Sequence, residues 1–501
     1  MNVTKLVRRG VVLALVCGAQ FMVVLDIAIV NVALPSIQED LDVVPSDLQW
    51  VVITYGLTLG GLLLLGGRAS DLLGRRNVLV AGLGLFTAAS LAAGLADSLG
   101  LLVAARAVQG VGGALTAPAA LSILASTFAE GAERNKALGI FGAVGGSAAS
   151  VGVILSGALT SGPGWPWIFL VNVPIGIVLV GLVLRFVPDS PPAEDRRGFD
   201  LPGAVAVTGG LMAIVYAINK SVDNGWTSGS TIGFLGGGAA LLALFLVIES
   251  RTASPLLPLS MFRRRTLNAA NLVAVLAFGS FFATIFQASL FMQQVLRYSA
   301  MRTGVAYLAI AATAFVVAGA VAARVVDKRG ASTALVLGQL SSAAGLLLLS
   351  RVPADADYWA DVFPGFFLIG IGIGFTGMAA QVAAFIGVEE RVAGLAGGMV
   401  ETAREVGGAL GIAVVGTVAL ARSEDVLATL GARASDPAGQ AFALTEGFQR
   451  GTLVMAAFSV AGAVVAALAL RPAERRAAAE AAAASADGIT VADPTPTPVT
   501  V

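Results

Sequence analysis

The stretch "VVLDIAIVNVALP", residues 23–35, places one carboxylate, Asp26, inside an apolar run that begins at Val11. A run of about 17–25 largely apolar residues is long enough to cross a bilayer as a helix. A lone charge inside such a helix is costly and normally faces a cavity or a partner group. The stretch therefore predicts a membrane helix, and Asp26 becomes a candidate functional residue.

The composition of the whole chain fits a membrane protein. Of its 501 residues 57% are hydrophobic and 12% charged, against about 25% charged residues in soluble proteins. The chain has no histidine, a single cysteine and a formal net charge of zero. Disulfides, Cys/His metal sites and a basic nucleic-acid surface are thereby excluded, and we expect no metal and no cofactor. Without histidine, proton exchange near neutral pH must use other groups.

Apolar segments long enough to span a bilayer recur along the chain, and they predict an all-α integral membrane protein. We expect fourteen, of which 48–67 and 201–219 are short and interrupted by glycine. They lie near residues 11–35, 48–67, 77–96, 100–127, 137–160, 167–187, 201–219, 231–249, 268–295, 303–325, 331–350, 362–386, 392–420 and 450–470.

Basic residues are distributed unevenly between the loops. With both termini inside, 22 of the 31 Lys and Arg residues fall at the inner ends, seven at the outer ends, and Arg106 and Arg404 within spans. Positive loops stay cytoplasmic, so we expect a multi-pass protein of the inner (plasma) membrane with both termini cytoplasmic. A cleaved signal peptide would explain the basic start, but the run is too long and no A-x-A site follows.

One loop pattern occurs twice, as Asp71-x-x-Gly74 and Asp327-x-x-Gly330, each flanked by basic residues. The repeat predicts two six-helix bundles, residues 1–198 and 263–471, with two inserted helices and a cytoplasmic linker in 199–262. The residues after Arg471 end in "DPTPTPVTV"; alternating Pro and Thr predicts a disordered cytoplasmic tail, 472–501.

Transporters built from two similar halves work by rocking one half against the other around a central substrate site. The repeated loops are candidate latches between two such bundles, because an aspartate among arginines can form ion pairs when one face of the protein closes. A solvated loop without a latch role is the alternative. The candidate latch residues are Gly67, Asp71, Gly74, Arg75, Arg76 and Asp327.

Three carboxylates lie in the interior of predicted spans, away from the span ends: Asp26, Glu401 and Glu405. Each in-span charge costs about 2.5–3.5 kcal/mol on insertion scales. A carboxylate in a cavity that opens alternately to two sides can bind a proton on one side and release it on the other. We therefore assign proton coupling to these three with Arg106 and Arg404. Static ion pairs, Glu401 with Arg404 and Asp26 with Arg106, are the alternative.

A substrate pocket is expected near the start of the second bundle, in "FGSFFATIFQASLFMQQ" (278–294). Aromatic faces attract organic cations by about 0.5–2 kcal/mol each, and glutamines add hydrogen bonds; lipid-facing phenylalanine is the alternative. The predicted substrate-binding residues are Asp26, Tyr55, Gln109, Phe278, Phe282, Phe286, Gln293, Gln294 and Glu401.

Several stretches resemble one family. "LDIAIVNVALP", "GRASDLLGRR" (67–76), "RAVQGVGGA" (106–114), "GWPWIFLVNVPIG" (164–176), "FDLPG" (199–203) and "ETAREVGGALG" (401–411) are similar to motifs of the fourteen-helix drug:proton antiporters of the major facilitator superfamily (QacA/EmrB-like). The resemblance implies the major facilitator fold, a proton or substrate-cation role for Asp26 and a proton-transfer role for Arg106. The chain departs from the family in its fifth helix, where residues 152–157 read Gly-Val-Ile-Leu-Ser-Gly, without the usual proline.

The function expected from these observations is proton-coupled export of amphipathic, often cationic, drugs by alternating access. The protein would act as a monomer in the lipid bilayer, with a small-molecule substrate and protons as partners and no nucleic acid. Proton-coupled uptake of a nutrient or siderophore remains an alternative because of the missing proline, as does a membrane sensor or scaffold. The chain has no G-x-x-x-x-G-K-[ST] motif for ATP and no nucleophile–base pattern, so we do not expect an enzyme.

Overall fold

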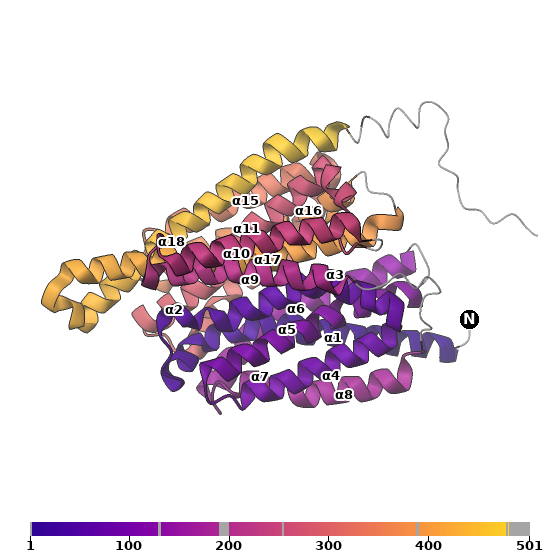
Figure 1. Cartoon of the computed structure of the whole chain (residues 1–501), viewed down its shortest axis with the longest axis horizontal. Coiled ribbons are helices and arrows are strands. Elements are labelled where there is room, and N and C mark those ends of the chain that lie inside the picture. The colour runs from indigo at the N-terminus through magenta and orange to yellow at the C-terminus, as the bar shows by residue number, and fades with distance from the viewer. Residues whose placement is uncertain are drawn as a thin grey trace, which may run out of the picture.

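The computed structural model describes residues 3–128, 132–189, 200–252, 255–386, 390–476 and 479, and every regular element among them is a helix. The long helices run roughly side by side (Figure 1). The first six predicted spans correspond to α1 (Val3–Asp40), α3 (Trp50–Leu73), α4 (Arg75–Gly94), α5 (Leu99–Thr127), α6 (Ala132–Ser161) and α7 with α8 (Trp167–Leu170, Asn172–Phe186), and a short α2 (Pro45–Leu48) precedes α3.

The two inserted helices are α9 (Leu201–Asn224) and α10 (Gly229–Arg251). The second six spans follow a short turn, η1 (Leu259–Arg263). The first three of these spans are α11 with η2 (Arg265–Leu290, Phe291–Val295), the sequence α12, α13, η3 and α14 (Ala300–Ala306, Leu308–Val316, Val317–Ala322, Ala323–Arg329), and α15 (Ala331–Leu349). The last three are η4 with α16 (Tyr358–Val362, Phe363–Phe385), α17 (Glu390–Leu430), and α18 with η6 (Pro437–Val465, Ala466–Leu470). The short η5 (Gly431–Ser435) joins α17 to α18.

Thirteen helical stretches of the described chain are long and apolar enough to cross a membrane. The remaining long helix, α6, has 30 residues and occupies the place of the fifth predicted span. The all-helical class is therefore confirmed, and α6 together with the thirteen stretches agrees with the predicted count of fourteen. Helix also continues to Arg476, five residues into the stretch that we predicted as tail; most of that tail lies outside the described residues.

The repeated loop has the same backbone geometry in both bundles. Gly74 separates α3 from α4 with φ 89°, and Gly330 separates α14 from α15 with φ 87°. Glycine adopts positive φ at little cost, which allows one helix to end and the next to begin within one residue. The two Asp-x-x-Gly loops thus join the second and third long helices of each bundle, as the spacing predicted. We call this end of the molecule the basic end.

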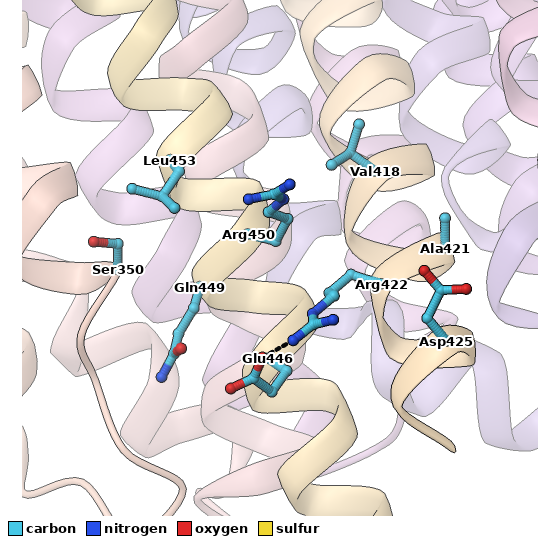
Figure 2. A pocket seen from close by; sticks show the side chains of 9 residues that line it. All are labelled: Ser350, Val418, Ala421, Arg422, Asp425, Glu446, Gln449, Arg450 and Leu453. Atoms are coloured by element: carbon cyan, nitrogen blue, oxygen red, sulfur yellow. Dashed lines mark hydrogen bonds and ion pairs between the residues drawn. The ribbon is translucent and has the colours of Figure 1, made fainter. Parts of the chain in front are cut away.

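The opposite end carries a helical hairpin that the sequence analysis did not predict. We expected spans 392–420 and 450–470, but α17 reaches Leu430 and α18 begins at Pro437. Charged residues in this region interrupt the apolar runs from which the spans were predicted, but the helices continue through them. The Arg422 Nη2 and Glu446 Oε2 atoms, 2.6 Å apart, join the two helices (Figure 2). The hairpin projects beyond the other helices at the left of Figure 1, and we call this the hairpin end.

The two bundles are in direct contact at the hairpin end. Ser289 Oγ donates to the Asn31 carbonyl (2.7 Å) and Gln293 Nε2 to the Val32 carbonyl (2.8 Å). Gln294 Nε2 donates to Gln38 Oε1 at 2.8 Å. These bonds hold α11 and η2 against α1.

The inserted helix α9 packs across the junction of the bundles. Asn219 Nδ2 donates to the Ser46 carbonyl in the first bundle (2.9 Å), and Thr417 Oγ1 of the second bundle donates to the Ile218 carbonyl (3.1 Å). Lys220 Nζ also lies 2.8 Å from Asp47 Oδ1. The insert therefore contacts both bundles.

Close helix packing generates a first prediction. A Cβ on Gly411 of α17 would lie 2.1 Å from the Gly279 carbonyl oxygen of α11, and the other nearest atoms are also backbone. Because backbone cannot rotate away, Gly411→Ala should lower the free energy of unfolding by about 1–3 kcal/mol, measured as a lower thermal midpoint in detergent. Gly377→Ala, in α16 with nothing within 4 Å of the added Cβ, is the matched control, and equal midpoints for the two variants would contradict this packing.

Candidate functional site

Asp26 is fully buried, at 0% exposure, in the middle of α1. Its Oδ2 accepts a hydrogen bond from Arg106 Nη1 on α5. Its Oδ1 accepts from Gln109 Nε2 on α5 at 2.7 Å and from Asn172 Nδ2 on α8 at 3.1 Å. Both carboxylate oxygens therefore have donors, which compensates part of the cost of burying the charge.

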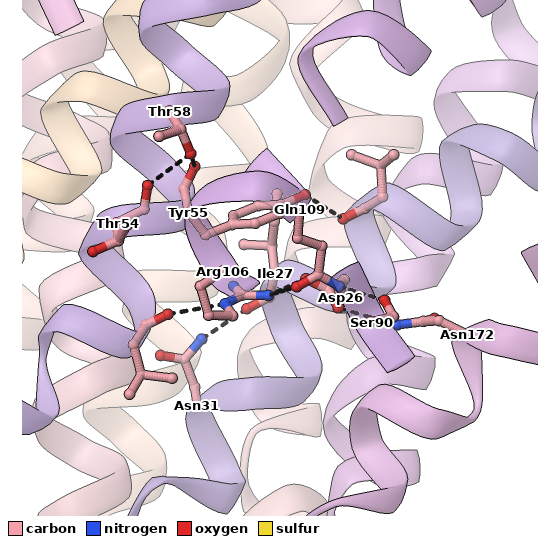
Figure 3. A network of polar contacts seen from close by, with 12 residues as sticks. Asp26, Ile27, Asn31, Thr54, Tyr55, Thr58, Ser90, Arg106, Gln109 and Asn172 are labelled. Carbon is pink, nitrogen blue, oxygen red and sulfur yellow. Dashed lines mark hydrogen bonds and ion pairs between the residues drawn. The ribbon is translucent and has the colours of Figure 1, made fainter. Parts of the chain in front are cut away.

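Arg106 is buried to 1% exposure and is held by several groups besides Asp26. Its Nε donates to the Val51 carbonyl of α3 at 2.9 Å, and its Nη1 to Gln109 Oε1 at 2.7 Å. The guanidinium carbon lies 4.2 Å from the centre of the Tyr55 ring, within the range of a cation–π contact. Figure 3 shows the arginine between Asp26 and Asn31, with Tyr55 above it.

The structure adds two residues that the sequence analysis did not assign to the site. Ser90 of α4 accepts from Gln109 Nε2 at 2.7 Å, and Asn172 donates to Asp26. Asn172 stands within the quoted stretch 164–176, yet a neutral polar residue in an apolar run gives little signal of its partner. With both included, side chains of α1, α4, α5 and α8 form one network, to which α3 adds the Val51 carbonyl. We call Asp26, Ser90, Arg106, Gln109 and Asn172 the central network.

A small cavity lies between the bundles beside this network. The first bundle contributes Ile27, Asn31, Val52, Tyr55, Gly56 and Arg106, and the second Phe282, Glu405, Gly408, Ala409 and Ile412. Its volume is about 20 Å³, room for little more than one water molecule. Drug-sized ligands occupy pockets of about 300–1,000 Å³. The bundles must therefore separate here before a substrate can reach Arg106.

A second group of charges lies on α17, in the other bundle. Arg404 Nη1 is 3.2 Å from Glu401 Oε2, and Arg404 Nη2 is 3.7 Å from Glu405 Oε1. Gln381 Nε2 donates to Glu401 Oε1 at 2.7 Å. The Glu401 and Arg404 side chains are 35% and 29% exposed, whereas that of Glu405 is 5% exposed. The group thus extends from an accessible acid to a buried one on the cavity wall.

The predicted substrate-binding residues separate into three locations. Tyr55, Gln109 and Phe282 lie at the central network or its cavity, and Phe278 lies under the Arg404 guanidinium at 5.0 Å. Phe286 is buried in the hydrophobic core. Gln293 and Gln294 bond α1 at the hairpin end. The structure places Tyr55, Gln109 and Phe282 near Asp26 and the other residues outside the cavity lining. The substrate-binding role of the whole set stays a prediction.

The predicted latch residues lie at the basic end. Arg76 Nη2 donates to the Leu184 carbonyl at the end of α8 (2.9 Å), and Arg76 Nη1 is 4.0 Å from Asp189 Oδ1. Gly67 lies inside α3, Arg75 begins α4, and Asp327 is exposed on α14. The Asp71 side chain lies outside the described residues, so its predicted ion pairs stay a prediction. Within the described chain there is no group of three or more His, Cys, Asp or Glu residues placed to bind a metal.

Comparison with known proteins points to one family. The family model described as Major Facilitator Superfamily matches residues 16–412. The puromycin resistance protein pur8 of Streptomyces alboniger is 38% identical over 455 residues, covering 90% of this chain and 89% of that protein. The cephamycin export protein CmcT of Amycolatopsis lactamdurans is 39% identical over 409 residues, covering 81% and 84%.

The fold is also found among solved structures. A bacterial homologue of the human lysosomal transporter Spinster, solved in an inward-facing, unoccupied conformation, superposes with a TM-score of 0.66 at 15% identity. The match covers 94% of this chain and 98% of that one.

The central network predicts how stability responds to removal of charge. Asp26→Asn leaves the Arg106 cation buried without its counter-charge, which should cost about 3–5 kcal/mol of unfolding free energy. Adding Arg106→Gln removes the unpaired charge, so the double variant should recover most of that loss. Thermal unfolding in detergent measures both. A double variant no more stable than the single one would show that the ion pair does not govern the stability of this region.

Proposed function

The chain belongs to the major facilitator superfamily, and we propose that it exports antibiotic-like amphipathic compounds in exchange for protons. Drug efflux agrees with its relatives, which are named for resistance to puromycin and for export of cephamycin. We further propose an inner-membrane location, a monomer, and both termini in the cytoplasm, which the basic residues at the basic end support.

The observation that carries the proton coupling is that the central network reaches the cavity between the bundles. Arg106 both binds Asp26 and lines the cavity, and Glu405 lines the same cavity from the second bundle. A proton or a cationic substrate that neutralises Asp26 removes the attraction that holds Arg106. The arginine is then free to turn toward Glu405. Proton binding on one side of the membrane would in this way change the charge that faces the substrate.

The energy for export would come from the membrane potential and the proton gradient. One elementary charge that crosses 100 mV releases about 2.3 kcal/mol, which sustains a gradient of roughly 50-fold in a neutral substrate. The charged group on α17 gives protons a way into this transport cycle, because Glu401 is accessible while Glu405 is buried. We propose that Glu401 and Arg404 exchange protons with solvent or meet the substrate, and that Glu405 relays the change to Arg106.

We also propose that the basic end closes in the alternate state. The Asp71-x-x-Gly74 loop and its arginines would then form ion pairs with the second bundle. Two matching turns at Gly74 and Gly330 support this, since they fix the ends of α3 and α14 at the same end of the molecule.

Proton exchange can be measured in everted vesicles energised to an acidic interior, with a pH-sensitive dye. Adding puromycin or a cephamycin should release protons with the wild-type protein. Asp26→Asn and the double variant Asp26→Asn/Arg106→Gln should reduce the release at least tenfold, because each removes the titratable group. Asp97→Asn, an exposed acid outside the network, is the control and should behave like the wild type.

The outcome separates coupling from export. Proton release that persists in the folded double variant would exclude Asp26 as a coupling group. Drug resistance of cells that express the wild type, without any proton release, would leave efflux standing and overturn proton exchange. Glu405→Gln then tests the proposed relay, because it should slow release while leaving binding of the compound intact.

A further inference from the structure

A second and larger cavity lies at the base of the helical hairpin, away from the central network. Its volume is about 500 Å³, within the range of small-molecule sites. In Figure 2, α17 and α18 form its two walls and Ser350, at the end of α15, its rim. The lining residues are Ser350, Val418, Ala421, Arg422, Asp425, Glu446, Gln449, Arg450 and Leu453. We call this the hairpin cavity.

The depth of the hairpin cavity matches the polar edge of the bilayer. Helix α15 has 19 residues, a length of about 28 Å, close to the roughly 30 Å of the hydrocarbon core. A helix of this length that spans the hydrocarbon core would end at the boundary with the headgroups, near Leu349, and Ser350 follows directly. Along α17 and α18 the apolar lining residues, Val418 and Leu453, lie on the membrane side of the charged ones.

The charges of the hairpin cavity are incompletely paired. Arg422 and Glu446 neutralise each other at 2.6 Å. Arg450 and Asp425 form no ion pair within the described part of the chain. The cavity thus offers one guanidinium and one carboxylate above an apolar floor. A simple anion would be repelled by the Asp425 carboxylate, and a simple cation would be repelled by the Arg450 guanidinium. Neither kind of ion matches the site alone.

We propose that the hairpin cavity binds a zwitterionic aminophospholipid, one with a phosphoethanolamine headgroup. Arg450 bonds the phosphate, to which the guanidinium geometry is suited. Asp425 accepts hydrogen bonds from the primary ammonium. The acyl chains follow Val418 and Leu453 into the hydrocarbon. A choline headgroup carries no N–H to donate to Asp425, and a glycerol headgroup carries no positive charge.

The proposal is tested on the full chain, purified and delipidated in detergent. Native mass spectrometry measures binding of phosphatidylethanolamine, phosphatidylglycerol and phosphatidylcholine with identical acyl chains. Phosphatidylethanolamine should bind about tenfold tighter than the other two, the effect of one charge-assisted hydrogen bond. Equal binding of the three lipids would overturn the proposal.

Two variants test the assigned contacts. Arg450→Gln should weaken all three lipids, and Asp425→Asn should abolish only the preference for phosphatidylethanolamine. Arg433→Gln at the hairpin tip and Asp355→Asn in the loop after α15 are matched controls, exposed and outside the cavity, and should change neither property. An unchanged Arg450→Gln would also overturn the proposal.

A soluble headgroup distinguishes a lipid from a free ligand. Phosphoethanolamine that displaces the bound lipid supports recognition of the headgroup. Phosphoethanolamine that binds to a protein to which no phospholipid binds would overturn the lipid assignment and make the cavity a site for soluble zwitterions.

Discussion

The buried ion pair between Asp26 and Arg106 is the constraint on which the first bundle depends. Taking both charges out of water is expensive, and attraction between them offsets the cost only when the remaining donors and acceptors are satisfied. Gln109, Asn172 and the Val51 carbonyl do so here. Because the pair and these groups lie on α1, α3, α5 and α8, satisfying the two charges fixes four helices relative to one another. The pair is thus a structural centre, and its Arg106 is the one charged residue that the described part of this bundle contributes to the cavity lining.

Lipid tails are as apolar as the side chains that helices present, so close packing must hold the helices together. Glycines permit that packing around the ion pair. A Cβ on Gly110 would lie 1.9 Å from Thr58 Oγ1, and one on Gly60 would lie 2.8 Å from the Glu405 Cβ. The first glycine brings α3 against α5, and the second brings the two bundles together beside the cavity. The close approach that these glycines permit explains why Arg106 of one bundle and Glu405 of the other line the same cavity.

Charge and hydropathy were sufficient to predict the spans and the repeated loop, and they gave the pairing of Asp26 with Arg106 as an alternative, which the structure shows. An unpaired charge in an apolar run must find a partner, and Asp26 and Arg106 were the opposite charges placed deep inside the first bundle's spans. Ser90 and Asn172 were not predicted, because neutral polar residues occur in membrane helices for many local reasons. The hairpin was missed because a run of apolar residues indicates only the part of a helix that lies in the membrane, and the charged ends of α17 and α18 continue beyond it. The position of α9 across both bundles depends on contacts such as Asn219 with Ser46, which no local pattern encodes.

The two bundles use the same helices for different purposes. In the second bundle, α11, α15, α16 and α18 occupy the order of α1, α4, α5 and α8, and they too share buried polar contacts. Gln339 Nε2 donates to Thr376 Oγ1 at 2.9 Å, and Ser280 Oγ lies 3.2 Å from Ser459 Oγ, but these groups are neutral. The charges of this bundle stand instead on α17, at its surface toward the first bundle. Rocking of one bundle against the other would therefore change the surroundings of Glu401 and Arg404 directly. Asp26 would sense it through Arg106, so in the proposed mechanism the arginine would be the point where motion and charge are coupled.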